Sequence, residues 1–167
     1  NSYPGGKLTE LKLGGYRFDA GPSLFTLPQA VEALFELAGE DPADHFEYVK
    51  LEKTCNYFYP SGESLTAWSD NERFAEELAN KLGEPKEYTL NALKQSAFLY
   101  NNLAPLFMEK SLHKASTWLG SKAFSAYTKL HKFNFNKTMN EANNARFKNE
   151  KTAQLFNRYA TYNGSDP

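Results

Sequence analysis

An alternation of apolar and polar positions opens the chain and predicts a β-hairpin. Residues 8–13 (LTELKL) alternate with the two-residue period of a strand, and residues 16–18 (YRF) resume that period after a short interruption. The interruption is Gly14-Gly15, which is typical of a two-residue turn. In an antiparallel pair, the start of the first strand lies beside the end of the second strand. The segments that flank this hairpin should therefore meet at one end of it.

Two glycine-containing segments occupy that end, Gly5-Gly6 before the hairpin and residues 19–22 (DAGP) after it. Glycine adopts positive φ angles without strain and allows another group to approach the backbone closely. The two segments therefore form either an edge that faces a ligand or a pair of ordinary turns. At the opposite end of the hairpin we interpret the two glycines as a turn only.

Strand and helix patterns follow along the rest of the chain. Residues 46–52 alternate as a strand, and residues 55–68 read as a second hairpin around Pro60-Ser61-Gly62. Helical periodicity occurs in four stretches: 26–39, 69–83, 86–107 and 149–164. The patterns predict an α+β fold, in which a small antiparallel sheet precedes a mainly helical second half. We expect two segments, one rich in hairpins and one helical: 1–68 and 69–167.

Local signals predict where some helices start and stop. Thr26 with Gln29, and Ser69 with Glu72, have the spacing of a capping box, in which the two side chains satisfy free N–H groups of the first helical turn. Pro105 should end or kink its helix, because proline has no backbone N–H to donate.

Composition narrows the function classes only slightly. The formal net charge is -1, which argues neither for nor against a nucleic-acid or membrane partner. The 13 Phe and 10 Tyr suit a large core or an apolar pocket. Cys55 is the single cysteine, which excludes an internal disulfide and a CxxC metal site, and the three histidines are far apart, so no metal is expected. No apolar run reaches the length of a spanning helix, and we expect no signal peptide.

Local charge is more informative than the total. Residues 110–137, the basic window, contain no Arg, Asp or Glu but contain these lysines: Lys110, Lys114, Lys122, Lys129, Lys132 and Lys137. Aromatic and leucine side chains lie between them. This mixture suits a helix or loop on an anionic membrane surface. It also suits a nucleic-acid groove, or a solvated basic face that packs its aromatic side chains inward.

Residues 4–39 resemble a known family. Their sequence contains Pro-Gly-Gly-Lys, a short hairpin, Phe-Asp-Ala-Gly-Pro and a Thr-x-Pro helix start. This order is similar to the segment that follows the Rossmann unit in the phytoene-dehydrogenase-like carotenoid desaturases, within the flavin-containing amine-oxidase superfamily. A weaker similarity returns at residues 155–167. The resemblance implies an FAD-dependent enzyme in which the flavin takes a hydride from a long polyene and a proton leaves the neighbouring carbon.

The resemblance also implies site residues. Those for the cofactor fall in two loops, the first approaching the FAD diphosphate and the second lying near the flavin: Gly5, Gly6, Lys7, and Asp19, Gly21, Pro22. Lys7 stands where the family usually has arginine, which keeps the positive charge but loses the bidentate fork. Because such an enzyme draws its substrate from the bilayer, the resemblance favours a membrane role for part of the basic window: Lys114, Trp118, Lys122, Lys129 and Lys132.

Other expectations follow from what the chain does not contain. A G-x-G-x-x-G motif occurs nowhere in it, so we expect an internal piece of a longer enzyme that alone is inactive and does not retain FAD. We expect a cytoplasmic location with peripheral membrane association and no nucleic-acid partner. No catalytic residue can be named. The alternatives are a non-enzymatic lipid- or membrane-binding domain, and another flavin oxidoreductase of the retinol-saturase-like or amine-oxidase-like kind.

Overall fold

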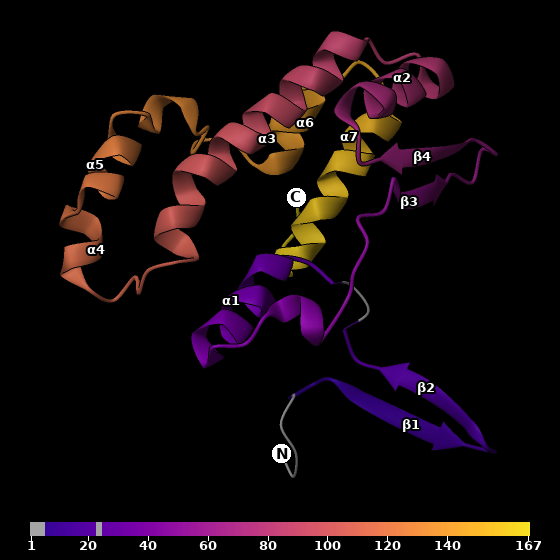
Figure 1. The fold of residues 1–167 in the computed structure, drawn as a ribbon. Helices are drawn as coiled ribbons and strands as arrows, with labels where there is room; N and C mark the ends of the chain where they lie inside the picture. The colour runs from indigo at the N-terminus through magenta and orange to yellow at the C-terminus, as the bar shows by residue number, and fades with distance from the viewer. Residues whose placement is uncertain (1–5, 23–24) are drawn as a thin grey trace. The chain divides into compact units, whose positions relative to one another are not determined.

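The structure is a computed structural model that describes residues 6–22 and 25–167. It contains two compact units, unit 1 (Asn1–Lys50) and unit 2 (Leu51–Pro167). Two small antiparallel sheets and mostly helical structure after them confirm the predicted α+β class (Figure 1). The compact units divide after Lys50, whereas the expected change of role lay after residue 68, and that division of roles stays a prediction.

Unit 1 consists of a hairpin, one helix and a single 3-10 turn. In chain order its elements are β1 (Thr9–Leu13), β2 (Tyr16–Ala20), α1 (Pro28–Ala38) and η1 (Pro42–Asp44). Strands β1 and β2 pair antiparallel, with Leu13 opposite Tyr16. Gly14 and Gly15 connect them with φ angles of 57° and 81°. A two-residue hairpin turn of this kind needs two positive φ angles, so the predicted first hairpin is confirmed.

Two predictions for this part of the chain are wrong. Residues 46–52 form no strand, although they alternate. Phe46 and Tyr48 stack on each other instead, with 5.8 Å between ring centroids, and the alternation reflects aromatic packing. Helix α1 also lacks the predicted capping box, because Leu27 occupies its N-cap in the left-handed conformation. Pro28 starts the helix with a preset φ and no N–H of its own to satisfy.

Unit 2 contains a second hairpin and a helical body. Its elements are β3 (Lys53–Phe58), β4 (Ser64–Trp68), α2 (Asn71–Leu82), α3 (Lys86–Phe107), α4 (Ala115–Leu119), α5 (Ser121–Tyr127), η2 (Leu130–Lys132), α6 (Met139–Arg146), α7 (Glu150–Asn157) and η3 (Arg158–Asn163). Strands β3 and β4 pair antiparallel, which confirms the second predicted hairpin. Helix α2 packs on β4 and on α3, and α5 packs on α3 (Figure 1).

The start of α2 differs from its prediction by one residue. Asp70 is the N-cap, and its carboxylate accepts a hydrogen bond from the backbone N–H of Arg73 at 2.8 Å. The predicted box of Ser69 and Glu72 is therefore wrong. Serine and aspartate are equally good caps, so the sequence alone does not distinguish two adjacent candidates.

The predicted ends of the other helices in unit 2 agree better with the structure. Helix α3 ends at Phe107, two residues after Pro105, as a proline near a helix end predicts. The helix predicted at 149–164 is present as α7 followed by η3, and Gly164 ends it in the left-handed conformation with φ 66°.

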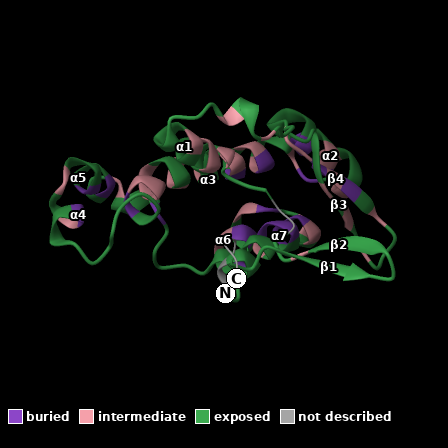
Figure 2. Ribbon diagram, turned by 60° about the horizontal axis from the view of Figure 1, so that its bottom comes forward, coloured by how far each residue is buried: buried purple, intermediate pink, exposed green. Residues whose placement is uncertain are grey.

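The buried apolar residues of the described chain all lie in unit 2 (Figure 2), and most of them form two clusters that each include part of α3. The first cluster joins β4, α2, α3 and α7, and Leu78 and Ala92 at its centre are fully buried. The second joins the C-terminal half of α3 to α5 and the turn after η2, where Phe133 is buried. A space left between two such clusters can hold a ligand.

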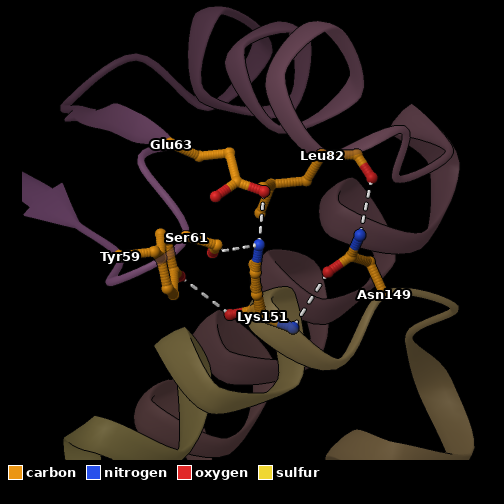
Figure 3. A network of polar contacts seen from close by, with 6 residues as sticks. All are labelled: Tyr59, Ser61, Glu63, Leu82, Asn149 and Lys151. Carbon is orange, nitrogen blue, oxygen red and sulfur yellow. Dashed lines mark hydrogen bonds and ion pairs between the residues drawn. The ribbon is translucent and has the colours of Figure 1, made fainter.

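A polar network fixes the start of α7 against the β3–β4 hairpin and the end of α2 (Figure 3). The ammonium of Lys151 donates to the hydroxyl of Ser61 at 2.7 Å and pairs with Glu63. Asn149 caps α7 by accepting from the N–H of Lys151 at 2.9 Å, and its amide donates to the carbonyl of Leu82 at 2.7 Å. The bonds to Leu82 and Ser61 connect α7 to segments that are more than sixty residues away in sequence.

Candidate functional site

The loops that flank the β1–β2 hairpin meet, as the sequence predicts. A Cβ added to Gly21 would lie 2.3 Å from the backbone oxygen of Lys7, so the two loop backbones touch at this point. Gly21 also has a φ angle of 120°, which residues with a side chain rarely adopt. The structure therefore explains this glycine by contact between the loops, whereas the sequence interpretation explained it by close approach to a cofactor.

Gly6 has a different environment. It has φ 61°, and no atom of the described residues lies within 4 Å of an added Cβ, so on this side its backbone is open to an approaching group. Lys7 beside it is exposed and makes no ion pair with any residue that the structure describes. Open backbone next to a free ammonium fits a phosphate group. Gly5, the other glycine assigned to this loop, lies outside the described residues.

The opposite strands place charged side chains on one face of the hairpin. Arg17 pairs with Glu10 at 2.5 Å and with Asp19 at 2.8 Å, and Lys12 pairs with Glu10 at 2.9 Å. Hydrogen bonds from Lys12 and Arg17 hold the pKa of Glu10 below its ordinary value. Asp19 is thus held by a neighbouring arginine, and with Pro22 it borders a shallow depression at this end of the hairpin.

Unit 2 contains an apolar pocket of about 440 Å³ that we did not locate from the sequence. It lies between α3, α6 and the α7–η3 segment, in the space between the two core clusters. Its apolar lining includes Leu93, Leu99, Phe133, Met139, Ala142 and Phe156. The abundance of aromatic residues indicated a core or a pocket. Its position depends on segments far apart in the chain, so no local spacing could reveal it.

A few polar groups also line this pocket. Asn143 is only 5 % exposed, and its amide nitrogen donates to the side-chain oxygen of Asn157 at 2.7 Å. Arg146 is half-buried, and burial lowers the pKa of its guanidinium. An apolar pocket with a small number of polar groups suits a hydrocarbon ligand that carries a polar atom.

Two residues of the basic window are less available for contact with a membrane than the sequence suggests. The indole of Trp118 donates to the carbonyl of Leu112 at 2.9 Å and packs edge-on against Phe107. The ammonium of Lys129 donates to the side-chain oxygen of Asn102 at 2.6 Å. Both side chains are therefore engaged within the protein.

Other side chains of the basic window face solvent. Lys114 and Lys132 are exposed, and Lys122 is exposed but pairs with Glu109 at 3.0 Å. Leu119 is 86 % exposed and Phe124 is 70 % exposed. The alternative of a solvated basic face with all its aromatic side chains packed inward therefore applies to only part of this window. The alternation of lysines and apolar residues suggested such a surface, but not which apolar residues would face outward.

None of the helices in the described residues combines the length and the apolar character that a bilayer span requires. In the same ranges, 6–22 and 25–167, no three His, Cys, Asp or Glu side chains are placed to bind a metal ion.

Known proteins resemble this chain along its whole length. No family model matches it. The 1-hydroxycarotenoid 3,4-desaturase of Flavobacterium sp. (strain P99-3) is 43 % identical over 167 residues, which is 100 % of this chain and 34 % of that protein. This chain is a homologue of the carotenoid desaturases. The family resemblance of residues 4–39 and 155–167 therefore extends through residues 52–150, where the sequence showed no recognisable motif of the family.

Two further relatives of this desaturase homologue agree with the first. The 4,4'-diapolycopene oxygenase of Methylomonas sp is 30 % identical over 169 residues, covering 100 % of this chain and 33 % of that protein. The hydroxyneurosporene desaturase of Rhodobacter capsulatus is 29 % identical over 167 residues, covering 98 % of this chain and 33 % of that protein. The chain thus spans about a third of the length of these curated relatives.

Proposed function

We propose that this chain is part of an FAD-dependent desaturase that introduces a double bond into a linear carotenoid. The observation that carries the proposal is 43 % identity to a 1-hydroxycarotenoid 3,4-desaturase along all 167 residues. The names of the other relatives also describe oxidative enzymes, so a non-enzymatic lipid-binding domain is not favoured.

In this proposal, unit 1 contributes to the cofactor site. Bound FAD supplies a hydride acceptor, and a proton leaves the adjacent carbon of the polyene as the new double bond forms. The open backbone of Gly6 and the unpaired ammonium of Lys7 hold the diphosphate. Gly21 brings the second loop against the first. Roles for three further residues rest on the family resemblance: Gly5, Asp19 and Pro22.

The pocket of unit 2 holds the polyene. Its apolar wall, which includes Leu93, Leu99 and Phe133, removes hydrocarbon from water, and each Å² removed contributes roughly 25 cal/mol. The wall also keeps water away from one end of the substrate and fixes its direction. Segment 69–167 thus serves the substrate, and segment 1–68 the cofactor.

The direct test uses the flavin-loaded full-length protein with a linear carotenoid in lipid or detergent. An added conjugated double bond moves the absorption of the polyene to longer wavelength, and we expect this shift with a product two hydrogens lighter. Leu99→Trp, which narrows the pocket, should lower kcat/KM, whereas Leu37→Trp at an exposed position of α1 should not. Unchanged substrate after exhaustive incubation would contradict the proposal.

We further propose that the basic window touches an anionic membrane surface. Leu119 and Phe124 offer apolar side chains to the lipid, and Lys114, Lys122 and Lys132 offer charge around them. Each lysine near such a surface adds about 1 kcal/mol of attraction.

Sedimentation with anionic vesicles tests this contact. Leu119→Ser with Phe124→Ser should weaken binding, and Leu37→Ser is a matched control because Leu37 is also 86 % exposed. Salt should weaken the wild-type contact. Lys129 is left unchanged, since its bond to Asn102 makes its loss a folding change. Absence of wild-type binding at low salt would remove membrane contact from the proposal.

A further inference from the structure

The apolar pocket of unit 2 carries two polar groups with unused hydrogen-bonding capacity. Asn143 and Arg146 are three residues apart on α6, so their side chains lie on the same face of that helix, and both line the pocket.

The other polar residues of the pocket are either exposed to water, as are Asn134, Lys137 and Tyr159, or bonded within the protein. The amide of Gln95 donates to the carbonyl of Lys132 at 2.8 Å, and the hydroxyl of Ser96 donates to the carbonyl of Ala92 at 3.0 Å. Thr138 caps α6 with its hydroxyl. These groups offer little to a ligand.

Arg146 has no such partner. Within the described chain its guanidinium makes no ion pair and no side-chain hydrogen bond, although it is half-buried beside apolar side chains. A guanidinium that is partly shielded from water is stabilised by an acceptor that reaches it. Arg146 lines the pocket and therefore offers unused donors to an acceptor on a ligand.

Asn143 provides the complementary group. Its amide nitrogen is used by Asn157, but its side-chain oxygen accepts no hydrogen bond from any described residue. The pocket thus offers one unused acceptor close to several unused donors. A hydroxyl group both donates and accepts, so it satisfies both residues at once. A carbonyl could only accept, and a hydrocarbon end could do neither.

We infer that Asn143 and Arg146 recognise a terminal hydroxyl of the carotenoid substrate. The inference rests on the proposed function and makes these residues determinants of specificity for hydroxylated over unsubstituted polyenes. The hydrocarbon chain next to the hydroxyl fills the apolar part of the pocket. A volume of about 440 Å³ is typical of a site for a small ligand, so the pocket takes one end of the long polyene.

The test measures binding separately from turnover in the flavin-loaded full-length protein. Three linear polyenes of equal length are compared, with a terminal hydroxyl, its methyl ether and an unsubstituted end, and tryptophan fluorescence quenching reports Kd. We expect affinity to fall in that order, with the hydroxyl preferred over hydrocarbon by about tenfold to a hundredfold. The ether oxygen can accept a hydrogen bond from Arg146 but cannot donate one to Asn143. The difference in Kd between the alcohol and the ether therefore measures the contact with Asn143.

Arg146→Met should bring the Kd values of the hydroxylated and unsubstituted polyenes within about twofold, with hydrocarbon binding unchanged. Arg146→Lys should retain part of the preference, and Arg73→Met, an exposed arginine of α2 outside the pocket, should retain all of it.

Equal Kd values for the three polyenes in the wild type would overturn the inference. An equal loss of affinity for the hydroxylated and the unsubstituted polyene in Arg146→Met would also overturn it. Turnover separates this inference from the proposed function. Selective binding without any desaturation would leave the pocket as described and overturn the enzyme proposal alone. Desaturation of hydroxylated and unsubstituted polyenes at equal kcat/KM would overturn the specificity alone.

Discussion

The two units of this chain contain similar hairpins but differ in what their apolar residues contact. In unit 2, β4 lies on α2, and Leu78 beneath it is fully buried. In unit 1, none of the residues that the structure describes is buried. One face of its β1–β2 hairpin carries four neighbouring large apolar side chains, each more than half exposed: Leu11, Leu13, Tyr16 and Phe18.

The difference shows which part of a fold local sequence can determine. Alternation and a glycine turn suffice to form the β1–β2 hairpin, because both act over a few residues. A two-stranded hairpin alone is marginally stable in water, and unit 2 gains its stability from helices that come later in the chain. We therefore expect mutations in the two hairpins and their surroundings to have unequal effects.

The largest effect should come from the core of unit 2. Leu78→Ala removes a fully buried side chain and should destabilise the chain by about 3 kcal/mol, because a cavity remains. Leu13→Ala should cost less than about 0.5 kcal/mol, since Leu13 is 74 % exposed. Urea denaturation followed by circular dichroism measures both. A large loss from Leu13→Ala would mean that the apolar face of the hairpin is covered in solution.

The same contrast explains how much of the fold could be predicted from the sequence. Both hairpins, the α+β class and the helical second half follow from periodicity and turn residues. The strand expected at 46–52 failed because alternation cannot tell whether a partner strand exists, and here Phe46 stacks on other rings. The predicted cap of α2 failed because Ser69 and Asp70 offered equivalent signals, whereas α1 starts at Pro28 after Leu27, which has no capping side chain.

The candidate site was predictable only where it is local. The meeting of the Gly6 and Gly21 loops followed from hairpin geometry, although the close contact between the two backbones did not. The roles of Asn143 and Arg146 could not be predicted, because an unpaired guanidinium is recognised only when its surroundings are known. Their pocket is also lined by residues of α3, Leu93 to Leu99, which lie between 44 and 53 positions earlier in the chain.

A buried carboxylate gives the next largest expected effect within unit 2. Glu84 is fully buried, and its oxygens accept from the backbone N–H groups of Lys148 at 3.1 Å and Asn149 at 2.9 Å. Glu84→Ala leaves both donors unsatisfied and should cost about 2–4 kcal/mol, and Glu84→Gln, which keeps one acceptor, should cost about half of that.

Glu87→Ala is the matched control for Glu84, since Glu87 lies three residues later, in the first turn of α3, and is exposed. It should change the free energy of unfolding by less than about 0.5 kcal/mol. Similar losses for Glu84→Ala and Glu87→Ala would contradict the structural role of Glu84.

Glycine variants in unit 1 test how its two loops contribute to stability and to cofactor binding. Gly21→Ala forces a Cβ against the backbone of Lys7 and should cost on the order of 1–3 kcal/mol locally, and it should lower flavin occupancy in the full-length protein. Gly6→Ala meets open space and should lower occupancy less. Flavin absorbance per protein measures both, and a larger loss from Gly6→Ala would show that Gly6 limits cofactor approach more than the loop contact does.

The smallest expected effect is a pH dependence in unit 2. Hydrogen bonds from Lys151 and Ser61 lower the pKa of Glu63 from its ordinary value of 4.5 to about 2. A carboxylate with a lowered pKa stabilises the fold above its ordinary pKa, and this contribution is lost as the pH falls from about 4.5 towards 2. Glu63→Gln should show a weaker loss of stability over that range, and an identical pH profile would mean that the pair contributes nothing.

The most direct measurement of the central claim mixes the flavin-loaded full-length protein anaerobically with a linear carotenoid. Hydride transfer should bleach the oxidised flavin band, and in the same phase the polyene absorption should move to longer wavelength, with one desaturation for each flavin reduced. A flavin that stays oxidised while the polyene remains unchanged would contradict the assignment of this chain to a flavin-dependent carotenoid desaturase.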